Sequence, residues 1–153
     1  LRLKELKNKI IQVLDRMEEN IPSHVIPIQS EDLHYQIARI YGDMEEKEAM
    51  RSILETLVNH PNGRPLNRVE YANTFFKELD DTEKSLQILE GMRSDYLRKE
   101  SMLKTRGFSK KTVKKGEWGR WQKASPTIIW KLMKLKQDQN LADAVVANQN
   151  KTN

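Results

Sequence analysis

The sequence predicts an all-α protein built from tandem antiparallel helical hairpins, with about six or seven helices in total. Apolar residues recur at helical spacing through most of the 153-residue chain. No stretch shows the sustained alternation of apolar and polar residues, bounded by turn signals, that indicates a β-strand. Proline, glycine and aspartate gather between the apolar stripes, where they mark the ends of helices.

The first apolar stripe runs from Leu3 to Met17 and ends near Pro22, because proline lacks the N–H that a continuing helix needs. Residues 21–29 contain two prolines in an apolar setting, and we expect an extended connection there. Ser30, followed by two acidic residues, has the features of a helix N-terminus. We therefore expect the next helix to begin there.

Two hairpins follow, over residues 31–59 and 67–97. The first breaks at Gly42 and Asp43, and the second at residues 80–82. Between the hairpins lies a turn-rich segment, 61–65, which contains two prolines and a glycine.

The two hairpins are related by a regular offset. Tyr41 aligns with Phe75 and Ala38 with Ala72, 34 residues apart, and after a slip of one residue Ile53 aligns with Ile88. A helix–turn–helix unit that recurs every 34 residues resembles the tetratricopeptide repeat. The resemblance implies a right-handed solenoid in which small residues stand where the paired helices cross. The sequence departs from the family pattern near the start of each first helix, where an aromatic residue is expected.

The organisation that we predict is as follows. Residues 1–101 form tetratricopeptide-like helices, and residues 102–116 a basic, glycine-containing loop. Residues 117–148 form C-terminal helices that close the array, with a kink or restart at Pro126 and a further break at Asn140. Residues 149–153 form a frayed tail.

Several kinds of chemistry have no support in the sequence. The chain has no cysteine, which excludes disulfides, thiolate metal sites and thiol nucleophiles. Its three histidines, His24, His34 and His60, lack the spacing of a metal-binding pair. Glycine-rich phosphate loops and the serine nucleophile motif are missing, and the acidic runs at helix starts are better explained as capping than as catalysis. We therefore expect no catalytic residue, no cofactor and no metal in this chain.

Positive charge is concentrated in one segment. Residues 104–123 carry eight basic side chains and one acid, a net of about +7, whereas the whole chain has a formal charge of +5 and the remainder is therefore about −2. Cations interleaved with aromatic rings can bind an anionic partner or single-stranded nucleic acid. The alternative, which we favour, is that the tryptophans cap the array and the lysines form a solvated loop. The candidate residues are Lys110, Lys111, Lys114, Lys115, Arg120, Trp118 and Trp121.

A second candidate site follows from the repeat resemblance, which implies that the first helix of each hairpin lines a concave groove. Such a groove, with aromatic and charged residues, suits an extended peptide or another domain. Packing against the rest of the parent protein is an equally good interpretation. The candidate groove residues are Tyr35, Gln36, Arg39, Glu70, Asn73, Phe76 and Lys77.

Residues 17–28 and the helix that follows, 33–41, resemble the C-terminal soluble region of a bacterial family of multi-pass membrane proteins related to protein O-mannosyltransferases. This resemblance implies that glycosyl transfer belongs to a membrane half outside this chain, and that these helices lie outside the cytoplasm, in the periplasm. We thus expect a non-catalytic protein-interaction module in a glycosyltransferase-associated protein. The alternative is a free-standing cytoplasmic adaptor that binds nucleic acid or another anionic partner through residues 104–123.

Overall fold

The computed structural model of the chain describes residues 31–60, 63–109 and 113–152, together with scattered residues between 5 and 16. Within this described part the chain is all-α and has no strand, which confirms the predicted fold class. The chain divides into two compact units, Leu1–Gly63 and Arg64–Asn153. The predicted connection over 21–29 and the predicted cap at Ser30 lie outside the described residues.

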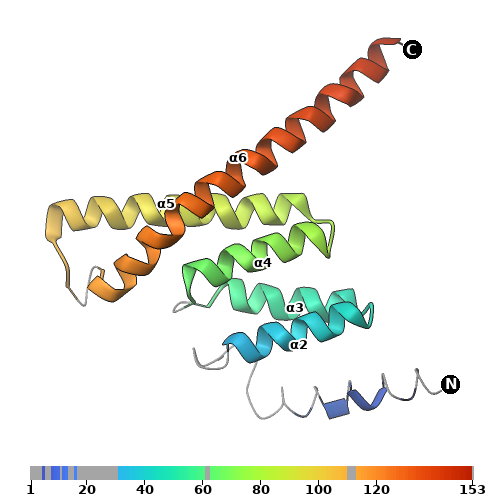
Figure 1. Cartoon of the computed structure of the whole chain (residues 1–153), viewed down its shortest axis with the longest axis horizontal. Helices are drawn as coiled ribbons and strands as arrows, with labels where there is room; N and C mark the ends of the chain where they lie inside the picture. Colours follow the sequence, from blue (N-terminus) through green and yellow to red (C-terminus); the bar gives the residue numbers. More distant parts are fainter. Residues whose placement is uncertain are drawn as a thin grey trace. The chain divides into compact units, whose positions relative to one another are not determined.

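The first unit contains a helical hairpin, formed by α2 (Glu31–Asp43) and α3 (Lys47–Val58), as Figure 1 shows. It corresponds to the hairpin predicted over 31–59. Of the residues that the helical spacing assigned to the apolar stripes, Leu33 and Ile40 are exposed and Val58 is half-buried, whereas the other six are buried. They are Ile37, Tyr41, Met50, Ile53, Leu54 and Leu57.

The turn between α2 and α3 is closed by backbone hydrogen bonds. The Glu46 N–H donates to the Tyr41 carbonyl over 2.9 Å and the Glu45 N–H to the Gly42 carbonyl over 3.0 Å, while Glu45 has a φ of 62°. This is the pattern of a Schellman motif, which satisfies the last carbonyls of a helix. A Cβ on Gly42 would lie 2.8 Å from the Met50 sulfur, so the glycine allows the Met50 side chain of α3 to approach α2 closely.

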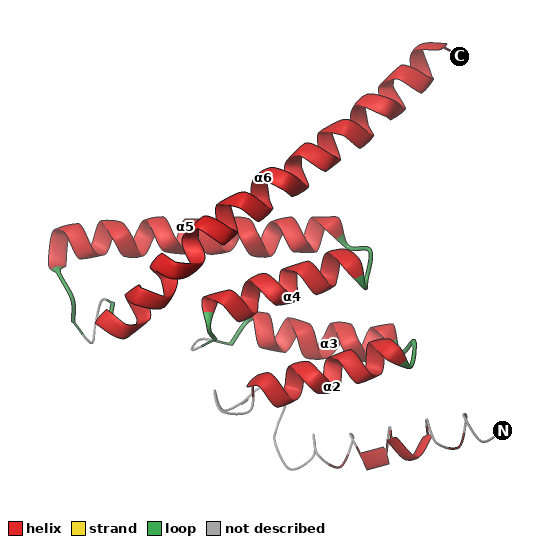
Figure 2. Ribbon diagram, in the orientation of Figure 1, coloured by secondary structure: helices red, strands yellow, loops and turns green. Residues whose placement is uncertain are grey.

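The second unit contains three helices, α4 (Pro65–Lys77), α5 (Thr82–Arg106) and α6 (Lys115–Thr152). Helix α4 begins with proline at its first position, where a missing N–H costs nothing. Helices α4 and α5 form the hairpin predicted over 67–97, and α6 packs against both of them (Figure 2).

The turn between α4 and α5 repeats the arrangement of the first hairpin with one extra residue. Asp80 has a φ of 51°, and the Asp81 N–H donates to the Phe75 carbonyl over 2.9 Å. Phe75 is the residue that aligns with Tyr41, so the one-residue slip in the sequence alignment lies within this turn. The Asp81 carboxylate also accepts a hydrogen bond from the Lys84 N–H over 3.0 Å, which confirms the capping interpretation for this acidic run.

Helix α5 is longer than the predicted hairpin and includes residues 102–106, and α6 includes residues 115–116, so both ends of the predicted loop 102–116 are helical. Basic residues alone do not end a helix, and lysine and arginine near its C-terminus complement the helix dipole. The helix ends at Gly107, which has a φ of 69° and donates its N–H to the Leu103 carbonyl over 3.0 Å.

Helix α6 differs most from expectation. Of the kink or restart predicted at Pro126, the restart is wrong, and so is the break at Asn140, because one helix continues to Thr152. Residues 149–152 are helical, and the fraying of the tail stays a prediction. Proline removes a single backbone hydrogen bond, and the buried neighbours Ala124 and Ile128 hold the helix on either side of it. Asn140 has a low helix propensity but does not prevent helical backbone.

The contact between α5 and α6 uses two of the three tryptophans. The Trp118 ring stacks on Tyr96, with centroids 5.0 Å apart and planes 18° from parallel. The Lys99 ammonium lies 5.6 Å from the centroid of Trp121 and 3.2 Å from the Glu117 carboxylate. These contacts join aromatic stacking, a cation–π interaction and an ion pair, and they fix α6 along α5.

Candidate ligand pocket in the second unit

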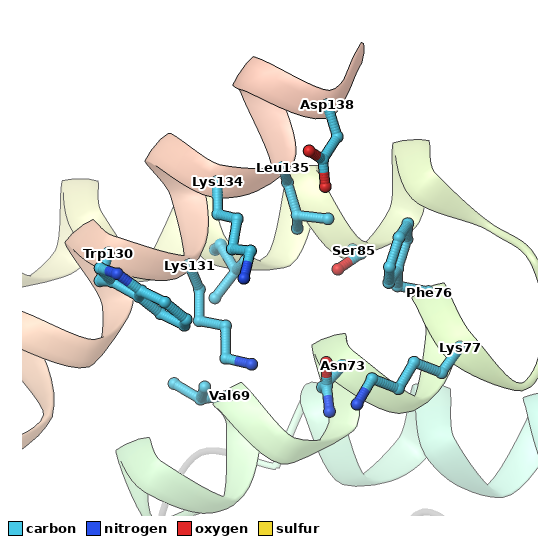
Figure 3. A pocket seen from close by; sticks show the side chains of 11 residues that line it. Val69, Asn73, Phe76, Lys77, Ser85, Trp130, Lys131, Lys134, Leu135 and Asp138 are labelled. Atoms are coloured by element: carbon cyan, nitrogen blue, oxygen red, sulfur yellow. The ribbon is translucent and has the colours of Figure 1, made fainter. Parts of the chain in front are cut away.

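A surface pocket with a volume of about 160 Å³ lies between α4, α5 and α6 (Figure 3). Polar side chains of α4 and α6 extend into the pocket, and Ser85 and Leu89 of α5 form its floor. The lining residues are Val69, Asn73, Phe76, Lys77, Ser85, Leu89, Trp130, Lys131, Lys134, Leu135 and Asp138.

Three lysines give the pocket its charge. Figure 3 shows Lys77 and Lys131 extending into the space from opposite sides toward Asn73, and Lys134 entering it from α6. None of the three makes an ion pair within the described part of the chain. Asp138 is the one acidic side chain among the lining residues, so the formal charge of the lining is +3 − 1 = +2.

Trp130 supplies an aromatic wall. The Lys131 and Lys134 ammonium nitrogens lie 5.4 Å and 4.9 Å from the centroid of its ring. These distances are within the range of cation–π attraction, which holds both lysine side chains near the indole. The Trp130 side chain is 55% exposed, in contrast to the buried Trp118 and Trp121.

The floor of the pocket contains an unsatisfied hydroxyl. Ser85 is fully buried, and its Oγ has no hydrogen-bond partner in the described part of the structure. In the alignment of the two hairpins, Phe76 and Ser85 occupy the places of Gly42 and Met50, so the large and small residues of the pair are exchanged between the helices. The exchange accounts for a small residue at position 85, but not for a polar one, because alanine would occupy the same space.

The predicted groove residues are partly brought together. Asn73, Phe76 and Lys77 line the pocket, whereas Glu70 is exposed and outside it. The other three predicted residues lie on α2 in the first unit. There the Arg39 guanidinium is 5.9 Å from the centroid of the Tyr35 ring, and Gln36 is exposed.

The basic segment shows a different arrangement from the one that base stacking needs. Lys114, Lys115 and Arg120 are exposed, and Lys110 and Lys111 lie outside the described residues. Trp118 and Trp121 are buried within the second unit, with 9% and 4% exposure, so their faces are used in packing on α5. The aromatic group of this segment that remains exposed is Phe108, whose ring has Lys115 Nζ 5.8 Å from its centroid.

Sequence reasoning missed the α6 side of the pocket. Lys131, Lys134 and Asp138 are spaced three and four residues apart and therefore share one face of a helix. The spacing predicts a shared face only for a continuous helix, whereas the sequence also predicts a kink or restart at Pro126 and a break at Asn140. The position of this α6 face beside α4 depends on the tertiary structure, which the periodicity of the sequence does not reveal.

The pocket offers charged, aromatic and hydrogen-bonding side chains to a ligand. The described residues contain no group of three or more histidine and acidic side chains that could hold a metal. Among the described helices none has the length and apolar character needed to cross a membrane. The fold and the pocket thus define an all-helical protein with a small, basic and aromatic surface pocket.

Comparisons with known proteins add no relative to this description. No protein family matches the chain, and no match was found among curated proteins or among solved structures. The function is therefore argued from the residues themselves.

Proposed function

We propose that this chain is a non-catalytic, tetratricopeptide-like interaction module that binds a segment of another protein or of its own parent chain. The observation that carries the proposal is the pocket between α4, α5 and α6, where three of the predicted groove residues meet an exposed tryptophan and two further lysines. Exposed aromatic rings in concave sites are frequent anchors of protein interfaces.

The size of the pocket supports a side chain as its occupant. Small-molecule and cofactor sites usually have volumes of roughly 300–1,000 Å³, whereas this pocket has about 160 Å³. A space of this size suits one or two side chains of a docked segment better than a whole cofactor. Helical hairpin proteins commonly bind extended segments along such surfaces.

Selection of random peptides displayed on phage tests the proposal. We expect peptides enriched on the wild-type chain to lose binding when Trp130 is replaced by alanine, because the aromatic wall is removed. A matched control is Met133→Ala, which truncates another exposed side chain of α6 that does not line the pocket. Failure to enrich any peptide, or equal binding by both variants, would overturn the proposal.

We further propose that the module belongs to a bacterial membrane protein related to glycosyltransferases and faces the periplasm. Its support is the resemblance of residues 17–28 and 33–41 to that family. Reading the gene upstream of the codon for Leu1 tests this: several apolar spans in the same frame support the proposal, and a start codon a few residues upstream contradicts it.

A second candidate function is binding of nucleic acid or another anionic partner through residues 104–123, which the exposure of Lys114, Lys115 and Arg120 favours. Titration with a single-stranded oligonucleotide at two salt concentrations tests it, since phosphate contacts make affinity strongly salt-dependent. Replacement of Lys110, Lys111, Lys114 and Lys115 by alanine should then weaken binding. Unchanged binding in that variant would exclude this site.

A further inference from the structure

The polar groups of the pocket are unbalanced. Three ammonium groups, from Lys77, Lys131 and Lys134, face one carboxylate, from Asp138. The lysines make no ion pair with any described carboxylate, although other lysines of the same unit do, such as Lys99 with Glu117 and Lys136 with Glu90. Three ammonium groups that face a single carboxylate repel one another, and a bound oxyanion would relieve that repulsion.

Two uncharged polar side chains, Asn73 and Ser85, also line the pocket and can donate hydrogen bonds. The amide of Asn73 lies between the ends of Lys77 and Lys131 in Figure 3. The fully buried Ser85 Oγ has no partner within the described residues, and a buried hydroxyl of this kind is costly unless a ligand or water reaches it. An oxyanion in the pocket would therefore find, besides the three ammonium groups, the Asn73 amide and the Ser85 hydroxyl as hydrogen-bond donors.

Apolar groups adjoin the lysines. Phe76, Leu135 and the Trp130 ring line the same space, so an occupant presents both an anionic group and an apolar one. A peptide with alternating acidic and aliphatic residues offers both kinds of group at side-chain spacing.

We infer that the pocket recognises an acidic segment of a protein partner, with a carboxylate between Lys77, Lys131 and Lys134 and an aliphatic side chain against Phe76 and Leu135. The inference rests on the proposed function and specifies the chemistry of its partner. Asp138 acts in the opposite sense, because its carboxylate repels the ligand and lowers the affinity.

Fluorescence anisotropy with a defined probe tests the inference. The probe is a labelled ten-residue peptide of alternating Glu and Leu, capped at both ends, and the matched probe has Gln in place of Glu. We expect saturable binding of the Glu peptide that weakens as salt is raised, and at least about tenfold weaker binding of the Gln peptide, because charge-assisted hydrogen bonds are lost. Equal binding of the two peptides would overturn the inference.

Variants assign the binding to the pocket. Replacement of Lys77, Lys131 and Lys134 by glutamine should weaken binding about tenfold or more, whereas Lys123→Gln, another exposed lysine of α6 that does not line the pocket, should leave it unchanged. Asp138→Asn should strengthen binding severalfold, and an affinity gain is not produced by loss of folding. If Asp138→Asn weakens binding, or if Lys123→Gln is as harmful as the triple variant, the inference is wrong.

The test separates this inference from the proposed function. If phage-selected peptides bind through Trp130 but the Glu peptide does not, the interaction module stands and the acidic partner is excluded. If neither kind of peptide binds, both fail. Tighter binding of a single-stranded oligonucleotide, or of phosphatidylserine vesicles, through the same three lysines would also exclude an acidic protein segment as the partner.

Discussion

At the scale of single residues, Trp130 differs from the other two tryptophans in both exposure and charge environment. It is 55% exposed and has two lysine ammonium groups within 5.4 Å of its ring centroid, whereas Trp118 and Trp121 are packed on α5. Its fluorescence therefore reports on the pocket, and collisional quenchers report on the local charge.

We expect iodide to quench Trp130 more effectively than caesium does, because the lysines concentrate anions near the ring. Replacing Lys131 and Lys134 by glutamine should reduce quenching by iodide and leave quenching by neutral acrylamide unchanged. The Trp130→Phe variant identifies the quenched fraction. Equal quenching by iodide and caesium in the wild-type chain would contradict an excess of positive charge near the Trp130 ring.

Glu90 gives a prediction of pH dependence. A hydrogen bond from Lys136 and the charge of that lysine lower the pKa of the Glu90 carboxyl below its ordinary value. Since the folded pKa is lowered, the pair stabilises the fold at pH values above the ordinary glutamate pKa, and this contribution is lost as the pH falls through the folded pKa. Both side chains are about half exposed, so the effect on stability is small.

Carboxyl-carbon NMR titration checks this prediction. In the wild-type chain Glu90 should titrate below the ordinary pKa of a glutamate, and Lys136→Gln should raise its pKa toward that ordinary value. Lys123→Gln serves as the control and should leave the Glu90 titration unchanged. A Glu90 midpoint that is the same with and without Lys136 would show that the ion pair does not form in solution.

At the scale of elements, α6 combines two unlike halves. Its first half supplies the buried residues Trp121, Ala124, Ile128, Leu132 and Leu135, whereas every described side chain from 136 to 149 is exposed. Most helical stability in proteins comes from a packed face. We therefore expect amide hydrogens of 118–135 to exchange slowly and those after 140 to exchange rapidly, as hydrogen-exchange mass spectrometry would show. Uniform protection along α6 would contradict this division.

Pro126 lies in the packed half of α6 and is exposed. Pro126→Ala should stabilise the second unit by about 1–3 kcal/mol, because alanine restores a backbone donor and removes the clash with the preceding turn. The gain is partly offset by the greater freedom of alanine in the unfolded chain. Chemical denaturation measures the change, with Thr127→Ala as the neighbouring control, and a loss of stability would show that the proline is required for the path of α6.

At the scale of the whole molecule, the chain has two units with separate sets of buried residues. Leu132→Ala truncates a buried residue of the second unit and should cost about 2–5 kcal/mol. Native-state hydrogen exchange should show the loss of protection in α4, α5 and the first half of α6, with α2 and α3 unchanged. Equal loss in α2 and α3 would show that the two units unfold as one.

Much of the architecture could be predicted from the sequence because local patterns specify helices and their ends. Tyr41, Ile53, Phe75 and Ile88 are buried as their spacing predicts, and Asp81 caps α5 as its position before an apolar stripe predicts. Predictions failed where a weak local signal was overridden. Pro126 disfavours a helix by a few kcal/mol, and the packing of its buried neighbours offsets that penalty. Asn140 has only a low helix propensity, which does not end a helix that has already formed.

The all-α class, the two hairpins and three of the eleven residues that line the pocket could be predicted from the sequence, because these depend on residue spacing within single helices. The burial of Trp118 and Trp121, the exposure of Trp130 and the meeting of Lys131, Lys134 and Asp138 with Asn73 and Lys77 follow from the tertiary structure alone. These features depend on where α6 packs, and that is set by contacts between residues distant in the chain, which no local pattern encodes.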